Sequence, residues 1–177
     1  MIQIEEQTIE RNTSRGGARA LFRLLLVALI AVGSDSLSKT WAEQALIPAV
    51  PVPVVGDIFR LTLGHNAGVA FGLFAGGGPW LLITGSAIIL SLVGWLSYSR
   101  CLGTAPAAAW PLGLIFGGAA ANLADRWSDG RVTDLLDLGI GSVRWPTFNL
   151  ADVFIVVGIG LLLCLSFRER PPSETHW

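Results

Sequence analysis

The sequence predicts an all-α integral membrane protein with four transmembrane helices and a small extracytoplasmic β-sheet between helices 1 and 2. Three observations predict this class. The 177 residues are 52% hydrophobic but only 14% charged, whereas average globular chains are roughly 25% charged. Four stretches are apolar enough for transmembrane helices, which need about 20 residues each. The segment VPVVGDIFRLTL, at residues 52–63, alternates in the manner of one or two short strands.

The four apolar stretches set the expected order of elements. We expect transmembrane helices at about residues 21–41, 80–98, 107–127 and 149–167, which together form one domain over 21–167. The extracytoplasmic loops are then 46–79 and 128–148. Both ends of the chain, 1–20 and 168–177, are polar and are expected to be disordered cytoplasmic tails. In the third helix, the small residues Gly113, Gly117 and Ala121 form a stripe that lets helices approach closely.

The distribution of arginines predicts that both termini lie in the cytoplasm, because cytoplasmic segments of membrane proteins are enriched in Lys and Arg. The cytoplasmic side then holds Arg11, Arg15, Arg19, Arg23, Arg100, Arg168 and Arg170. The opposite side holds Arg60, Arg131 and Arg144. The first apolar stretch is not expected to be a signal peptide, since Asp35 and Lys39 follow it in place of a small-residue cleavage site.

Composition also excludes some classes of function. The 12 Lys and Arg residues are balanced by 13 Asp and Glu residues, for a net charge of -1. Nucleic-acid binding is therefore not expected, because it relies on a basic excess to contact phosphates. Two cysteines are too few for a secreted disulfide scaffold.

Polar residues gather at one end of the predicted helices, although an ionisable side chain within a bilayer is costly. Helix 1 ends with Asp35 and Lys39, spaced to share one face. Further members follow at the end of helix 3, in the next loop and at the start of helix 4: Asn122, Asp125, Arg126, Asp134, Asp137, Asn149 and Asp152. All of them fall on the extracytoplasmic side, so the sequence predicts one polar site there.

Each cluster also has a purely structural explanation. Asn149 and Asp152 are spaced as a helix cap, Asp35 and Lys39 as an intrahelical ion pair, and the loop acids as solvated residues. Taken together, however, several acids without a Ser/His, Cys/His or metal-ligand arrangement favour a carboxylate pair as the reactive unit. Two carboxyl groups held close share a proton, so one draws a proton from water while the other polarises a carbonyl. Spacing alone does not choose the pair.

Five motifs occur in a characteristic order: DSLSK at 35–39, NAGVAFG at 66–72, NLADR at 122–126, VTD at 132–134 and FNLAD at 148–152. Together they resemble the lipoprotein signal peptidase family, also called signal peptidase II. The resemblance runs from the first to the fourth predicted helix. It implies an aspartic endopeptidase of the bacterial inner membrane that removes signal peptides from prolipoproteins, immediately before a diacylglyceryl-modified cysteine.

The resemblance also implies roles for individual residues. Asp134 and Asp152 match the catalytic acids of the family. The supporting and substrate-binding positions match Asp35, Lys39, Asn66, Asn122, Asp125, Arg126 and Asn149. A short helical flap is implied between helices 3 and 4. No metal and no cofactor are expected; the implied partners are lipidated prolipoproteins and membrane lipids, and the protein is expected to be a monomer.

Two other functions stay open at this point. A small polar-lined membrane transporter would use the same acids, but transporters place polar groups near the middle of the membrane, with paired halves that are not evident here. An inactive homologue that only binds lipopeptide is the second alternative, and the presence of both Asp134 and Asp152 favours an enzyme over it.

Overall fold

The computed structural model describes residues 2–67, individual residues between 83 and 99, and residues 106–168. Three long helices lie wholly within the described residues: α1 (Ile2–Ala45), α3 (Ala109–Asp129) and α4 (Leu150–Arg168). A short 3-10 helix, η3 (Pro106–Ala108), precedes α3. The strands are β1 (Val52–Val55), β2 (Phe59–Asn66), β3 (Val132–Ile140) and β4 (Val143–Arg144).

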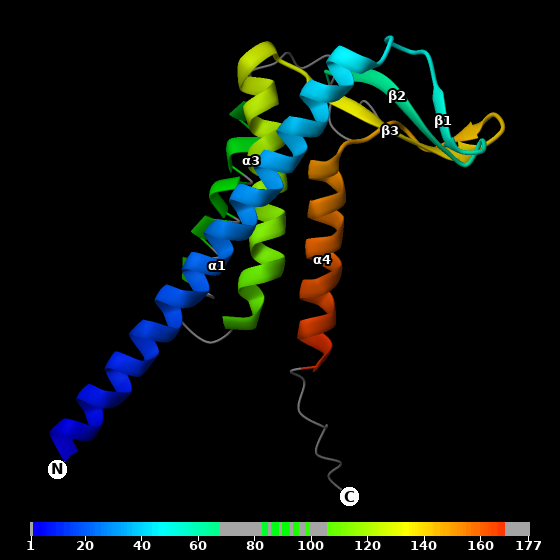
Figure 1. Ribbon diagram of the computed structural model, residues 1–177. Helices are drawn as coiled ribbons and strands as arrows, with labels where there is room; N and C mark the ends of the chain where they lie inside the picture. The colour runs from blue at the N-terminus through cyan, green and yellow to red at the C-terminus, as the bar shows by residue number, and fades with distance from the viewer. Residues whose placement is uncertain are drawn as a thin grey trace, which may run out of the picture.

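The described helices lie lengthwise beside one another, with the sheet at one end (Figure 1). α1 and α3 run toward the sheet and α4 runs away from it, and α3 packs against both of the others. The predicted stripe of small residues faces α1. A Cβ atom on Gly117 would lie 2.7 Å from the backbone oxygen of Ala28, and one on Gly113 would lie 2.8 Å from that of Leu24. The close approach predicted for this stripe is confirmed.

The outside of the helices is apolar, while much of the buried interior is polar. Leu29 on α1 and Val156 on α4 are 70% and 68% exposed. The buried polar and charged residues are Asp35, Lys39, Asn122, Arg126, Thr133, Asp134, Asp137 and Asn149. Of the described helices, the segments Gly16–Ala45 and Leu150–Arg168 are long and apolar enough to cross a membrane. This distribution suits a lipid solvent, which solvates apolar side chains and leaves polar groups to satisfy one another.

The sheet has the order β1-β2-β3-β4, and all neighbouring strands are antiparallel. The sheet extends beyond the predicted segment 46–79, because residues 132–144 supply half of its strands. The family-based expectation of a helical flap in 128–148 was also wrong for this chain, since residues 132–140 form β3. The segment pairs with β2, and these backbone hydrogen bonds decide its conformation more than its irregular apolar pattern.

The remaining expectations concern the helices and the tails. α3 and α4 begin and end within two residues of the predicted stretches. Residues 2–20 are helical rather than disordered, because the segment contains no proline and only two adjacent glycines to interrupt the helix that follows. The expected second helix, 80–98, lies largely outside the described residues, although those described between 83 and 99 are helical. Most of the expected C-terminal tail, residues 169–177, also lies outside them.

Candidate active site

The chain brings Asp134 and Asn149 together by folding residues 145–148 back along β3. The Trp145 N–H donates to the Leu138 carbonyl at 2.8 Å, and Phe148 exchanges backbone hydrogen bonds with Leu136 at 2.8 and 3.0 Å. Asn149 follows directly, and its Nδ2 donates to Oδ1 of Asp134 at 2.8 Å. The side chains of both residues are buried, so this short return places an amide against a carboxyl group away from water.

A reciprocal cap fixes the start of α4. The Asp152 N–H donates to Oδ1 of Asn149 at 3.0 Å, and the Asn149 N–H donates to Oδ2 of Asp152 at 3.3 Å. These bonds satisfy amide groups that have no partner within the helix. The capping explanation offered by the sequence is therefore confirmed as geometry. The same Asn149 side chain contacts Asp134, so the cap also links the two acids.

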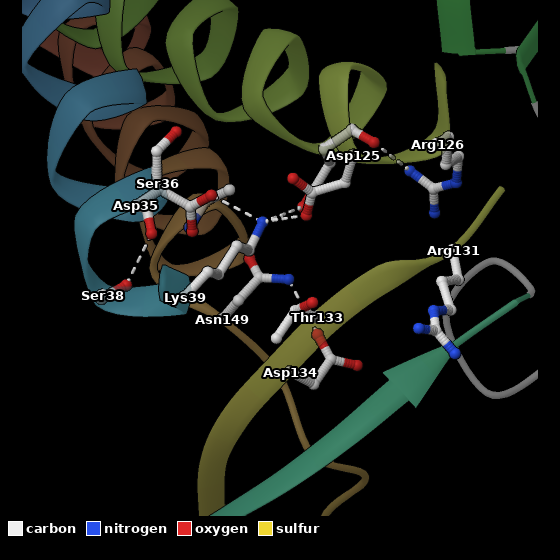
Figure 2. Close-up of polar contacts among 12 residues, drawn as sticks. Asp35, Ser36, Ser38, Lys39, Asp125, Arg126, Arg131, Thr133, Asp134 and Asn149 are labelled. Carbon is white, nitrogen blue, oxygen red and sulfur yellow. Dashed lines mark hydrogen bonds and ion pairs between the residues drawn. The ribbon is translucent and has the colours of Figure 1, made fainter. Parts of the chain in front are cut away.

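Lys39 lies at the centre of a buried polar cluster that joins α1 to α3. Its Nζ atom is 2.6 Å from Oδ2 of Asp35, 2.7 Å from Oδ2 of Asp125 and 3.1 Å from Oδ1 of Asn122. Figure 2 shows the Lys39 side chain reaching from α1 toward Asp125 on α3. The predicted ion pair within α1 is present, and Asp125 forms an ion pair with Lys39 as well.

Two hydrogen bonds connect this cluster to α4. Nδ2 of Asn122 donates to Oδ1 of Asp152 at 2.9 Å. Oδ1 of Asp35 accepts the N–H of Ala151 at 2.8 Å. α1 and α3 therefore both contact the first turn of α4, and Asp152 lies where their contacts meet.

Asp134 and Asp152 line one cavity of about 540 Å³. Asn66, Asn122, Arg126 and Asn149 contribute further polar groups to its wall. The rest of the lining is mostly apolar and includes Leu138, Trp145, Val153, Val156 and Val157. Val156 and Val157 belong to the exposed face of α4, so the cavity wall continues onto the apolar exterior of the helix.

Burial raises the pKa of Asp134 to about 7. The nearby Asp152 carboxyl group adds to this rise, while hydrogen bonds from Asn149 and Asn66 and the charge of Lys39 oppose it. Asp134 is therefore half protonated near neutral pH, although a solvated aspartate is fully ionised there. A carboxyl group in this state can donate a proton at physiological pH.

Asp137 has a different environment from Asp134. Arg60 and Arg144 each contact its carboxylate at 2.8 Å, and the Thr62 hydroxyl donates to it at 2.9 Å. Burial alone would raise the pKa of Asp137, but these hydrogen bonds outweigh burial and hold the pKa below its ordinary value. Asp137 is not among the residues that line the cavity.

The second polar cluster, formed by Asp57, Arg60, Asp137 and Arg144, was not identified from the sequence. Asp57 connects the two hairpin turns, because its carboxylate contacts Arg60 at 3.0 Å and accepts the Gly141 N–H at 2.6 Å. Oppositely charged residues across neighbouring strands would have been the signal for it. Using that signal requires the register of β2 and β3, which follows from recognising β3 as a strand.

The structure brings most of the sequence-predicted site residues together. The members of the joined clusters are Asp35, Lys39, Asn66, Asn122, Asp125, Arg126, Asp134, Asn149 and Asp152. Arg126 donates from Nη1 to the Asn122 carbonyl at 3.1 Å, and its charge faces Asp152, Asp125 and Asp134. Within the described part of the chain, no group of three or more His, Cys, Asp or Glu residues is arranged to hold a metal ion.

An apolar helical exterior, a buried polar cluster and a cavity lined by Asp134 and Asp152 at the sheet end define a class of protein: a membrane-type helical protein with a polar site at one end. Comparison with known families narrows this class. Residues 27–168 match the family model described as signal peptidase (SPase) II. The chain belongs to the signal peptidase II family.

Named relatives and solved structures agree with this assignment. The chain is 38% identical over 145 residues to the lipoprotein signal peptidase of Desulforapulum autotrophicum, covering 80% of this chain and 89% of the relative. It is 34% identical over 160 residues to that of Xylella fastidiosa strain M12, covering 86% and 93%. Two structures of bacterial membrane enzymes share its fold, with TM-scores of 0.74 and 0.72, identities of 22% and 23%, and coverage of 87% and 83% of this chain and 93% and 94% of theirs.

Proposed function

We propose that this protein is a membrane aspartic endopeptidase that removes signal peptides from prolipoproteins immediately before the diacylglyceryl-modified cysteine. Family membership supports peptide cleavage, and it does not favour the transporter alternative. The observation that carries the aspartic mechanism is that Asp134 and Asp152 both line one cavity and are linked through Asn149.

Asp152 and Asp134 divide the acid and base work in this proposal. Asp152 acts as the base, since its carboxylate oxygens accept hydrogen bonds from the Asn122 side chain and the Asn149 backbone. Asp134 holds a proton because burial raises its pKa to about 7. The two carboxyl groups therefore share one proton, as two close acids do.

The reaction then follows in two steps. Asp152 takes a proton from a water molecule as its oxygen attacks the scissile carbonyl carbon, and Asp134 gives its proton to the carbonyl oxygen. The tetrahedral intermediate collapses when one of its hydroxyl groups returns a proton to Asp134 and Asp152 protonates the leaving nitrogen. The products are a carboxylic acid and an amine, and the pair regains its starting protonation.

The lining of the cavity is suited to a lipid-linked peptide substrate. Its polar side holds the two acids with Asn66, Asn122 and Arg126, which are suited to bind a peptide backbone. Its apolar side leads to exposed residues of α4, where an acyl chain or an apolar signal helix would arrive from the bilayer. In this proposal the sheet end lies at the extracytoplasmic face of the bacterial inner membrane, both termini are cytoplasmic, and the protein acts as a monomer.

The test is cleavage of a diacylglyceryl-modified prolipoprotein peptide by the full-length protein purified in detergent. Mass spectrometry is expected to show cleavage immediately before the modified cysteine. Asp134→Asn and Asp152→Asn should each abolish cleavage without loss of fold. Asp129→Asn, which changes an exposed acid paired with Arg131, is the matched control and should cleave normally.

Three results would contradict the proposal. Lack of cleavage by the folded wild-type protein would favour an inactive lipopeptide-binding homologue. Normal cleavage by Asp134→Asn would require another acid in the pair. Loss of cleavage on adding a chelator would contradict a reaction that proceeds without metal.

A further inference from the structure

We propose that Lys39 is a positioning residue that holds the Asn122 amide in the orientation that makes Asp152 the ionised member of the carboxyl pair. This inference rests on the proposed function and adds a role for a side chain outside the cavity. Asn122 and Asp152 line the cavity, and Lys39 does not. Any effect of Lys39 on the reaction therefore passes through a neighbouring residue.

Three acceptor oxygens surround the Lys39 ammonium group. An ammonium has three N–H donors and no acceptor. Its three partners within 3.1 Å are a carboxylate oxygen of Asp35, a carboxylate oxygen of Asp125 and Oδ1 of Asn122. The Lys39 side chain is 5% exposed, so water has little access to replace one of them. Asn122 must therefore turn its oxygen toward Lys39.

The nitrogen end of the Asn122 amide faces Asp152. With Oδ1 directed at Lys39, Nδ2 of Asn122 points at Asp152 and donates to its Oδ1 at 2.9 Å. In the flipped orientation, two donors would face each other at Lys39, and two acceptors would face each other at an ionised Asp152. Only a protonated Asp152 would tolerate the flipped amide. Lys39 thus selects the amide orientation that stabilises a carboxylate at Asp152.

A second contact of the same cluster reinforces this selection. Asp35 is paired with Lys39 through Oδ2 and accepts the Ala151 N–H through Oδ1. Ala151 directly precedes Asp152, so the contact fixes the first turn of α4 against α1. The contact therefore helps to hold the Asp152 carboxyl group beside the Asn122 amide that Lys39 orients.

Two other groups act on Asp152 beside the Asn122 amide. Arg126, from α3, faces both Asp152 and Asp134, and its attraction to Asp152 is the stronger one, so its charge adds to the stabilisation of a carboxylate there. Asn149 donates to Asp134 from its side chain and to Asp152 from its backbone, and it also serves both. The Asn122 amide donates a hydrogen bond to Asp152 from another helix, and Lys39 sets its direction.

The experiment is a double-mutant cycle on cleavage of the lipidated peptide, with Lys39→Met, Asn122→Ala and the double variant of the full-length protein. Each single variant should lower kcat by about 10- to 100-fold, the range expected for one hydrogen bond to a charged group. The KM of Lys39→Met should stay within about twofold, because Lys39 lies outside the cavity. The double variant should be no slower than the slower single variant, since both changes remove the same bond to Asp152.

If Lys39 only stabilised the fold, the double-mutant cycle would give a different result. If the losses in kcat multiply in the double variant, or if Asn122→Ala leaves kcat unchanged, the inference is overturned. Arg131→Met, which removes an exposed arginine at the same end of the molecule, is the control and should leave kcat unchanged. These outcomes are separate from those of the proposed function, which fails if Asp134→Asn or Asp152→Asn cleaves normally.

Lys39→Met leaves Asp35 and Asp125 without their cation, so a second variant guards against a loss of fold. The double variant Lys39→Met/Asp125→Asn removes one positive and one negative charge together. Its kcat is compared with that of Asp125→Asn alone. The inference requires the double change to lower kcat by about 10-fold or more relative to that reference. Equal kcat values for the two proteins would overturn it.

Discussion

Asp134 and Asp137 lie three residues apart on β3, and this odd spacing gives them different neighbours. Successive side chains of a strand point to opposite faces of a sheet. Asp134 lines the cavity with Asp152, whereas Asp137 lies between Arg60 and Arg144. Its partners keep Asp137 ionised, while burial keeps a proton on Asp134 near neutral pH. The same residue type therefore has a structural role at one position and a proposed catalytic role at the other.

The structural role of Asp137 can be tested by Asp137→Asn. The change weakens two ion pairs to partly buried arginines and should lower the free energy of unfolding by about 1–3 kcal/mol. Cleavage by the folded fraction should keep a kcat within about threefold of wild type, because the side chain lies outside the cavity. Thermal unfolding and the cleavage assay measure both effects. A loss of kcat as large as that of Asp134→Asn would instead make Asp137 a candidate for the pair.

Asp134 also predicts the pH dependence of cleavage. Its protonated form is the active one in the proposed reaction, and its pKa is raised to about 7. As the pH rises through this value, the proton is lost and kcat/KM should fall, approaching tenfold per pH unit above it. A profile of kcat/KM between pH 5 and 9 measures this decline. A rate that stays constant to pH 9 would exclude Asp134 as the proton donor.

At the residue scale, the sequence motifs contain the acids and amides that the fold brings together around the cavity. Family resemblance, rather than spacing, selected Asp134 over Asp137. The two acids have different neighbours because of the register of β3 against β2. Asp134 is opposite Gly64, and Asp137 is opposite Arg60. That register depends on an irregularity in β2 between Leu61 and Gly64, which no local pattern indicates.

At the scale of elements, the contact between α3 and α4 positions Asp152. Gly118 of α3 faces the first turn of α4, where an added Cβ would contact the backbone oxygen of Ala151 and lie 2.9 Å from Cγ1 of Ile155. Backbone atoms cannot move far to make room for an added Cβ atom. The separation of the two helices at Asp152 is therefore set by the absence of a side chain at Gly118.

Gly118→Ala should accordingly disturb the site as well as the fold. Overpacking costs about 1–3 kcal/mol, part of which the higher helix propensity of alanine offsets. We expect a lower melting temperature and a kcat at least about tenfold lower, because Ala151 precedes Asp152. Gly160→Ala is the matched control, since nothing lies within 4 Å of its Cβ position, and it should keep full activity. Equal kcat values for the two variants would show that α4 is not positioned by this contact.

Helices and strands differed in how far the sequence revealed them. α3 and α4 follow from continuous apolar stretches with polar residues at their ends, a signal that is local. β3 was missed because its residues VTDLLDLGI do not alternate, and their conformation depends on β2, more than 60 residues earlier in the chain. The helical start of α1 does not follow from the sequence pattern, because its polar composition is typical of a disordered tail.

At the scale of the whole molecule, the candidate active site and the start of α1 lie far apart. The site lies beside the sheet, and the N-terminal part of α1 extends past α3 at the opposite end (Figure 1). The match to the signal peptidase II family begins only at residue 27. The 44 residues of α1 also exceed the roughly 20 that cross a bilayer, so part of this helix lies outside the hydrocarbon.

Deletion of residues 2–15 should therefore leave cleavage of the lipidated peptide within about twofold of wild type. The remaining helix, from Gly16 to Ala45, is still long and apolar enough to span a membrane. Measurement of kcat and KM for the purified truncated protein checks this expectation. A large rise in KM alone would show that the N-terminal segment takes part in substrate binding.

The central claim is that Asp134 and Asp152 act as one unit that shares a proton across the cavity. The most direct measurement is kcat for Asp134→Asn, Asp152→Asn and the double variant on the lipidated peptide. Residues that act as a unit are strongly non-additive, so each single change should reduce kcat to the level of the double variant. Substantial activity in either single variant, with a further multiplicative loss in the double, would contradict a shared pair.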